Sequence, residues 1–166
     1  MRKRKPQELK VSGIEWIEHI PNEWENVKAK YVAKLEYGDS LASNDRTDGE
    51  ISVFGSNGVV GKHNIANTKS PVIVIGRKGS YGKVNFSVNK CFAIDTTYFV
   101  DSSKTKNFIK WVYYLFSCME LDAYSKDTGV PGLSRDDVYT RKVPLPSYSE
   151  QKAIATFLDR KTQAID

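Results

Sequence analysis

A glycine-rich loop at residues 76–82 holds the side chains of this sequence that are best suited to binding a ligand. It follows the apolar run 72–75 and places Arg77, Lys78, a serine hydroxyl and a tyrosine ring between three glycines. Glycine allows close approach of the backbone to a ligand, and a buried strand before the loop would hold it in place. The loop is therefore suited to binding a polyanion.

A second loop of this kind lies upstream at residues 55–63, after the β-like run 51–54. The segment from Ile51 to Ile94 has no Asp or Glu and carries six Lys or Arg residues, whereas the whole chain has a net charge of +5. Positive charge is thus concentrated here, although a generic solvated face would mix both signs. The pattern favours an acidic partner, and nucleic acid fits it best.

Length and composition set the class of protein. The 166 residues, of which 40% are hydrophobic, suffice for one globular domain with a real core. The sequence contains no apolar run long enough to span a membrane and no apolar signal-peptide core, so we expect a cytoplasmic protein. Cys91 and Cys118 form no CxxC pair, and with two histidines they predict no structural metal.

Signatures of nucleotide chemistry are missing, because neither Gly61-Lys62 nor Gly82-Lys83 continues into Ser or Thr as a Walker loop requires. A Mg²⁺-dependent nuclease remains an alternative, since Asp137, Glu150 and Lys152 supply the residue types that hold the metal and orient water. Its context is poor, because Glu150 opens a helix and no second strand presents it beside Asp137. An RNA-binding module is the other alternative.

Short strands with glycine turns predict an α+β fold, in which a bent, mixed or antiparallel sheet is flanked by helices. The expected strands cover 51–54, 72–75, 83–88, 91–94, 97–100 and 138–143. Helices are expected at 27–35 and, from its apolar period, at 106–125. Residues 37–50 and 129–137 are expected to be loops.

The last helix has the clearest start signal. Ser147 and Glu150 fit a capping box, which divides the chain into a domain at 1–146 and the start of a helix at 147–166. One face of this helix is apolar and is expected to pack against its own domain at the start and against a partner helix if the chain continues; it carries Ile154, Phe157, Leu158 and Ile165. Because no C-cap precedes Asp166, we expect the helix to continue. The basic tail 1–5 is either a solvated terminus or an arm along phosphates.

A series of short motifs follows one another along the chain: Ile20-Pro21 to Trp24, Phe54-Gly55-Ser56-Asn57-Gly58 with Gly61, Ile75-Gly76-Arg77-Lys78-Gly79-Ser80 with Gly82, Asp95-Thr96, Gly129, Pro131-Gly132-Leu133-Ser134-Arg135, Pro144-Leu145-Pro146, Glu150-Gln151, Ile154, Phe157-Leu158-Asp159 and Ile165-Asp166. In these motifs and their order, the chain resembles the target-recognition domain of a type I restriction-modification specificity subunit. The motifs cover nearly the whole chain. The resemblance implies that the domain is followed by the start of a long spacer helix.

The resemblance implies a non-catalytic reader of one half of a DNA site, in a subunit where two such domains are joined by antiparallel helices. Methylation and cleavage would belong to methyltransferase and restriction subunits, which use S-adenosylmethionine, ATP and Mg²⁺, with no cofactor in this chain. The expected partners are double-stranded DNA, those subunits, and a second specificity half or a second copy. A chain with one domain is either a half-subunit or part of a longer protein, and the bases it reads do not follow from one sequence.

The expected DNA contacts combine the two glycine loops with their polar neighbours. They are Asn44, Arg46, Ser56, Asn57, Lys62, His63, Arg77, Lys78, Ser80, Tyr81, Lys83 and Arg135. Within this set, Lys62, Arg77, Lys78 and Lys83 are expected to grip phosphates, because they lie in or beside the loops.

Overall fold

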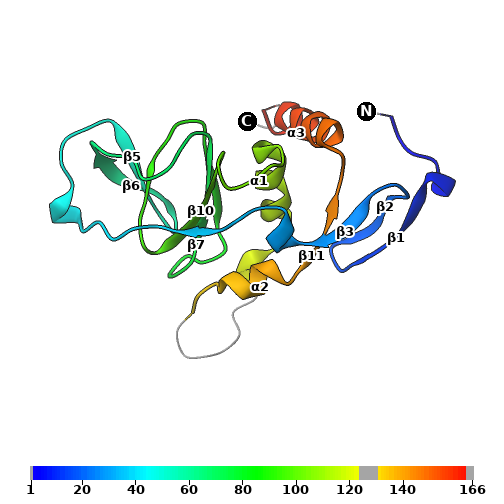
Figure 1. Ribbon diagram of the computed structural model, residues 1–166, viewed down its shortest axis with the longest axis horizontal. Coiled ribbons are helices and arrows are strands. Elements are labelled where there is room, and N and C mark those ends of the chain that lie inside the picture. The colour runs from blue at the N-terminus through cyan, green and yellow to red at the C-terminus, as the bar shows by residue number, and fades with distance from the viewer. Residues whose placement is uncertain (1, 124–130, 164–166) are drawn as a thin grey trace.

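The computed structural model describes residues 2–123 and 131–163 and confirms the expected α+β class (Figure 1). Its strands are β1 (Leu9–Ile14), β2 (Ile17–Pro21), β3 (Glu25–Lys28), β4 (Glu36–Tyr37), β5 (Ile51–Gly55), β6 (Gly58–His63), β7 (Val72–Gly76), β8 (Val84–Ser87), β9 (Phe92–Ala93), β10 (Thr97–Asp101) and β11 (Lys142–Leu145). The α-helices are α1 (Ile109–Cys118), α2 (Arg135–Tyr139) and α3 (Tyr148–Gln163).

Within the described residues the strands form four small sheets rather than one continuous sheet. The largest has the order β4-β10-β7-β8 and is antiparallel, while the sheet β6-β5-β9 contains a parallel pair between β5 and β9. The pairs β1-β2 and β3-β11 lie at the other end of the molecule from the β5-β6 hairpin (Figure 1). The molecule is thus elongated, with the cationic segment at one end.

Strand β7 joins the two parts of the hydrophobic core, because all five of its residues are buried. Ile73 and Ile75 pack on one side against α1, whose buried face includes Val112. Val72 and Val74 face the other way, into a smaller cluster with Phe54 of β5. Burial on both faces explains why this strand is a continuous apolar run rather than an alternating pattern.

Several sequence expectations on local structure are wrong. Residues 27–35, expected to be helical, continue β3 and then form a short 3-10 turn at Ala29–Tyr31. The strand expected at 138–143 is instead the end of α2 followed by β11, which pairs with β3. Helix α2 also begins at Arg135, inside the stretch 129–137 that was expected to be a loop. The Ser134 hydroxyl caps this helix by accepting a hydrogen bond from the Asp137 backbone N–H at 3.1 Å.

Helix α3 begins with the expected capping box. The Glu150 N–H donates to the Ser147 hydroxyl at 3.3 Å, and the Ser147 N–H donates to the Glu150 carboxylate at 3.2 Å. Of the expected partner face, Ile154 packs on the domain core, Leu158 is half-buried and Phe157 is 41% exposed. Ile165 lies outside the described residues.

The basic N-terminal tail contacts the domain through the Glu150 carboxylate, which also belongs to the capping box. Arg4 pairs with Glu150 at 2.9 Å and with Glu23 at 2.5 Å, and the Trp24 indole donates to Glu150 at 3.2 Å. Arg2 pairs with Glu8 at 2.6 Å. These side chains satisfy one another, so the two arginines are not free cations in this arrangement.

Acid should loosen this junction. Burial alone would raise the pKa of Glu150, but hydrogen bonds from Trp24 and Ser147 and the charge of Arg4 hold that pKa below its usual value. A depressed folded-state pKa stabilises the fold above about pH 4.3, and this contribution is lost as the pH falls further. We expect Glu150→Gln to lower the urea midpoint at pH 7, and we expect its difference from the unsubstituted chain to shrink as the pH falls below about 4.3 and the carboxyl group binds a proton. A matched Glu15→Gln change at an exposed turn should not alter the midpoint at any of these pH values, and a Glu150→Gln penalty that does not change with pH would contradict the assignment.

Candidate nucleic-acid interface

Three loops meet at the end of the molecule that carries the β5-β6 hairpin. They are the hairpin turn at Ser56, the glycine loop 76–82 and the turn before β10 at Thr96. The Ser56 hydroxyl lies 2.5 Å from the Lys78 carbonyl oxygen and 2.8 Å from the Thr96 carbonyl oxygen, and its one proton is shared between these two acceptors. Segments separated in the sequence thus form one surface, because this half-buried hydroxyl contacts the backbones of both other loops.

The glycine loop folds back on itself. The Gly82 N–H donates to the Gly76 carbonyl at 2.8 Å, and the Gly76 N–H donates to the Lys83 carbonyl at 2.9 Å. Gly79 and Gly82 have φ values of +71° and +78°, which favour glycine. The closed loop leaves the Lys78 and Ser80 side chains exposed and Tyr81 half-buried.

Lys83 links this loop to the hairpin. Its ammonium group donates to the Asn57 side-chain oxygen at 2.6 Å, and both residues are exposed. An amide partner leaves the positive charge of the lysine in place, whereas a carboxylate would neutralise it. Among the residues that the structure describes, Lys83 and Lys78 therefore have no carboxylate partner, and they present positive charge on the joined loops.

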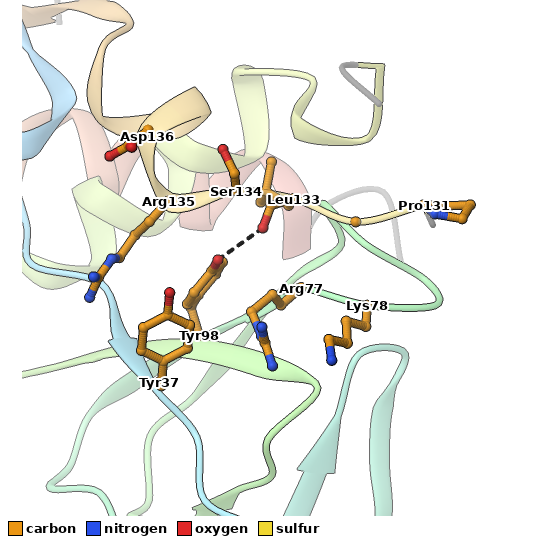
Figure 2. A pocket seen from close by; sticks show the side chains of 10 residues that line it. Tyr37, Arg77, Lys78, Tyr98, Pro131, Leu133, Ser134, Arg135 and Asp136 are labelled. Atoms are coloured by element: carbon orange, nitrogen blue, oxygen red, sulfur yellow. Dashed lines mark hydrogen bonds between the residues drawn. The ribbon is translucent and has the colours of Figure 1, made fainter. Parts of the chain in front are cut away.

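Arg77 is held rather than free. Its Nε and Nη2 atoms donate to the Asp95 carbonyl at 3.2 and 2.6 Å, and its guanidinium carbon lies 5.2 Å from the centre of the Tyr37 ring. Arg135 approaches the same ring at 4.7 Å. Figure 2 shows these side chains around a shared pocket, to which β4, the glycine loop and the start of α2 contribute.

The other candidate contacts lie toward the far end of the hairpin. Arg46 donates to the Val60 carbonyl at 2.9 Å, and Lys62 pairs with Glu50 at 2.6 Å. Asn44 is exposed in a 3-10 turn. The structure therefore divides the predicted set into the joined loops and a second group in which the cations already have partners.

His63 is the one predicted contact that the fold places in the interior. It is 7% exposed, its Nδ1 accepts from the Thr47 N–H at 3.0 Å, and its ring meets Phe92 edge-on at 5.6 Å between centres. A buried ring with a satisfied nitrogen has no surface for a ligand, so we remove His63 from the proposed contacts. Its position at the end of β6, which the sequence suggested was a loop, explains the error.

Tyr37 is the functional candidate that sequence reasoning missed. It lies in a polar stretch expected to be an exposed loop, and only its pairing with Tyr98 across β4 and β10 brings it to the arginines. No local pattern signals that pairing, because β4 has only two residues.

The described residues give the nuclease alternative no metal site. They contain no group of three or more His, Cys, Asp or Glu side chains placed to hold an ion. Glu150 is occupied by Arg4, Trp24 and Ser147 at the start of α3, whereas Asp137 lies on α2 at the opposite side of the fold (Figure 1). In the part of the chain described, no helix is long and apolar enough to cross a membrane.

Comparisons with known proteins show which family the chain matches. A family model described as the type I restriction modification DNA specificity domain matches residues 21–166. The Type I restriction enzyme EcoprrI specificity subunit of Escherichia coli is 28% identical over 108 residues, which are 64% of this chain and 27% of that protein.

Solved structures agree on the fold. The type I restriction-modification S subunit from M. genitalium superposes with a TM-score of 0.72 at 19% identity, over 90% of this chain and 42% of that one. The HsdS subunit from Thermoanaerobacter tengcongensis gives 0.65 at 16% identity, over 96% and 41%. The chain thus spans less than half the length of these relatives.

Proposed function

Because the chain belongs to the type I restriction-modification DNA specificity family, we propose that it recognises double-stranded DNA in a sequence-specific way and reads one half of a bipartite site. The chain matches 42% or less of the length of the relatives above, which is the extent expected of one reader in a two-reader subunit. Its role is binding, and it catalyses neither methylation nor cleavage.

One observation supports this proposal above the others. The hairpin turn and the glycine loop are joined through Ser56, and they present Lys78 and Lys83 on the same surface without a carboxylate partner among the described residues. Phosphate contacts of this kind fix a protein on a duplex, while neighbouring polar side chains read base edges. Asn57 and Ser80 are exposed beside these lysines and are the proposed base readers.

The assembly partners follow from the family. We propose that α3 begins the spacer helix and that methyltransferase and restriction subunits assemble on the complete protein. S-adenosylmethionine, ATP and Mg²⁺ would then act in those subunits.

The RNA-binding alternative is weaker, because the aromatic side chains of the cationic segment are not exposed platforms for stacking. Phe54 and Phe92 are buried, and Tyr81 and Phe86 are half-buried. Single-strand readers need open rings on which bases can stack.

Selection from a random duplex library tests the proposed function. We expect a short enriched sequence and binding that favours duplex DNA over single-stranded RNA. Recovery of no common sequence, or stronger binding of the RNA, would refute sequence-specific duplex recognition, and cleavage of the duplex with Mg²⁺ would refute the non-catalytic role.

The salt dependence of duplex binding should separate free from paired lysines. The slope of log affinity against log salt is negative, and each lost phosphate contact reduces its magnitude by about 0.9. We expect this change for Lys78→Ala, on cognate and random duplexes alike, and a smaller one for Lys62→Ala because Glu50 already neutralises Lys62. Lys10→Ala removes the same charge from β1 at the opposite end (Figure 1) and should leave the slope unchanged. If Lys78→Ala, Lys62→Ala and Lys10→Ala all keep the slope of the unsubstituted chain, the glycine loop is excluded from the interface.

A further inference from the structure

A recessed pocket of about 410 Å³ lies between the glycine loop and the start of α2 (Figure 2). Tyr37 and Tyr98 form its aromatic side, Arg77 and Lys78 come from the glycine loop, and Arg135 comes from α2. The pocket lies beside the loops proposed to bind DNA, but sequence reasoning did not identify it as a cavity.

The pocket has an excess of positive charge. Among the described residues no carboxylate lies within ion-pair distance of Arg77, Lys78 or Arg135. The acid that lines the pocket, Asp136, points its carboxylate away from Arg77 (Figure 2). The chemistry offered is therefore that of hydrogen-bond donors to an anion.

A single ring holds the two guanidinium groups together. Arg77 and Arg135 lie 5.2 and 4.7 Å from the centre of Tyr37, and Arg77 also lies 5.9 Å from Tyr98. The negative face of an aromatic ring attracts a cation, which offsets part of the repulsion between the guanidinium groups. The Asp95 carbonyl occupies the Nε and Nη2 atoms of Arg77, so its Nη1 atom remains available to a ligand.

The backbone makes this arrangement rigid. The Leu133 N–H donates to the Arg77 carbonyl at 2.9 Å, and the Tyr98 hydroxyl donates to the Leu133 carbonyl at 2.9 Å (Figure 2). Lys78 and Gly132 form a β-bridge. Donors fixed before binding lose little conformational freedom when the ligand arrives, which increases affinity.

We propose that this pocket is a clamp for a single phosphate of the DNA backbone, in which Arg77 and Arg135 hold the anion and Tyr37 positions both arginines. The inference rests on the proposed DNA-binding function. A paired base presents its edge within a groove, whereas phosphates are the outermost groups of a duplex, so a phosphate can enter a recess that a paired base cannot reach. The clamp therefore fixes the register of the protein without reading sequence.

The test measures the salt slope of binding to cognate and random duplexes. We expect Arg135→Gln to reduce the magnitude of the slope by about 0.9 on both duplexes, whereas the matched change Arg160→Gln, at an exposed position of α3, has no effect. Tyr37→Phe keeps the ring and should bind normally, but Tyr37→Leu should reproduce the loss seen for Arg135→Gln. Urea midpoints establish that each variant is folded; if Tyr37→Leu is not, Arg135→Gln still decides the outcome.

Four results would overturn the clamp. If Arg135→Gln leaves the slope unchanged while Lys78→Ala reduces its magnitude, the pocket is not a phosphate site, although the loops still bind DNA. A loss confined to the cognate duplex would assign Arg135 to base reading. Binding of inorganic phosphate or ATP that depends on Arg135 and exceeds duplex affinity at equal ionic strength would assign the pocket to a free phosphate compound. Failure of the unsubstituted chain to bind any duplex would remove both the clamp and the proposed function.

Discussion

Replacing Gly82 with alanine is expected to destabilise the protein by roughly 2–5 kcal/mol, the sum of a strained backbone and an overpacked site. A Cβ atom at this position would lie 2.3 Å from the Asp122 backbone nitrogen and 2.5 Å from the Leu121 carbonyl carbon. Both neighbours are backbone atoms, so no side-chain rotation relieves the contact. The φ of +78° adds a cost of its own.

Gly79 provides the matched control in the same loop. Its φ is +71°, but a Cβ atom there would meet nothing within 4 Å. Gly79→Ala should therefore cost about 1 kcal/mol, from backbone conformation alone. Urea unfolding of the two variants measures the difference. Equal costs would contradict the packing of Gly82 against residues 121–122, and unchanged stability with lost DNA affinity would mean that the glycines serve approach to the ligand.

Sequence patterns predicted those elements of the fold that are determined by residues close together in the chain. The apolar run of β7, the helical period of α1 and the capping box of α3 each predicted the element that is present. The concentration of cations also identified the two loops that the fold joins. In these cases burial or a backbone hydrogen bond is encoded by neighbouring residues.

The features that the sequence did not predict depend on pairing between distant parts of the chain. Residues 58–63 read as a loop because glycines interrupt them, yet they pair with β5 as the second strand of a hairpin. Lys62 belongs to a segment without acids, but its partner Glu50 lies one residue before that segment begins. The pocket depends on Tyr37, whose place follows from its register with β10. These contacts join separate parts of the chain, so a pattern read along the sequence does not contain them.

Fusing the chain to a second copy through an extension of α3 should raise affinity for a bipartite site by about 10²–10⁴ over a single half-site. Once the first domain has bound, the second half-site is present at a high effective concentration, provided that the spacer spans the gap. Helix α3 is suited to this use, since it begins with a fixed cap and packs on the core through Ile154 and the buried Ala155. Its direction is therefore set by the domain that reads the DNA.

The preferred gap should follow the length of the spacer. Three added heptads keep the same helix face toward a partner and lengthen a helix by about 31 Å, at about 1.5 Å per residue. That distance is close to one turn of DNA, about 34–36 Å, so both readers still face the same side of the duplex. Site selection should then return the two half-sites about 9 base pairs farther apart, at about 3.4 Å per pair. A flexible Gly/Ser linker of equal residue number is the control, because it preserves bivalency without fixing the distance. If the rigid fusion selected the same gap at both lengths, α3 would not be the spacer, since a rigid element that sets the separation of two readers must change that separation when it is lengthened.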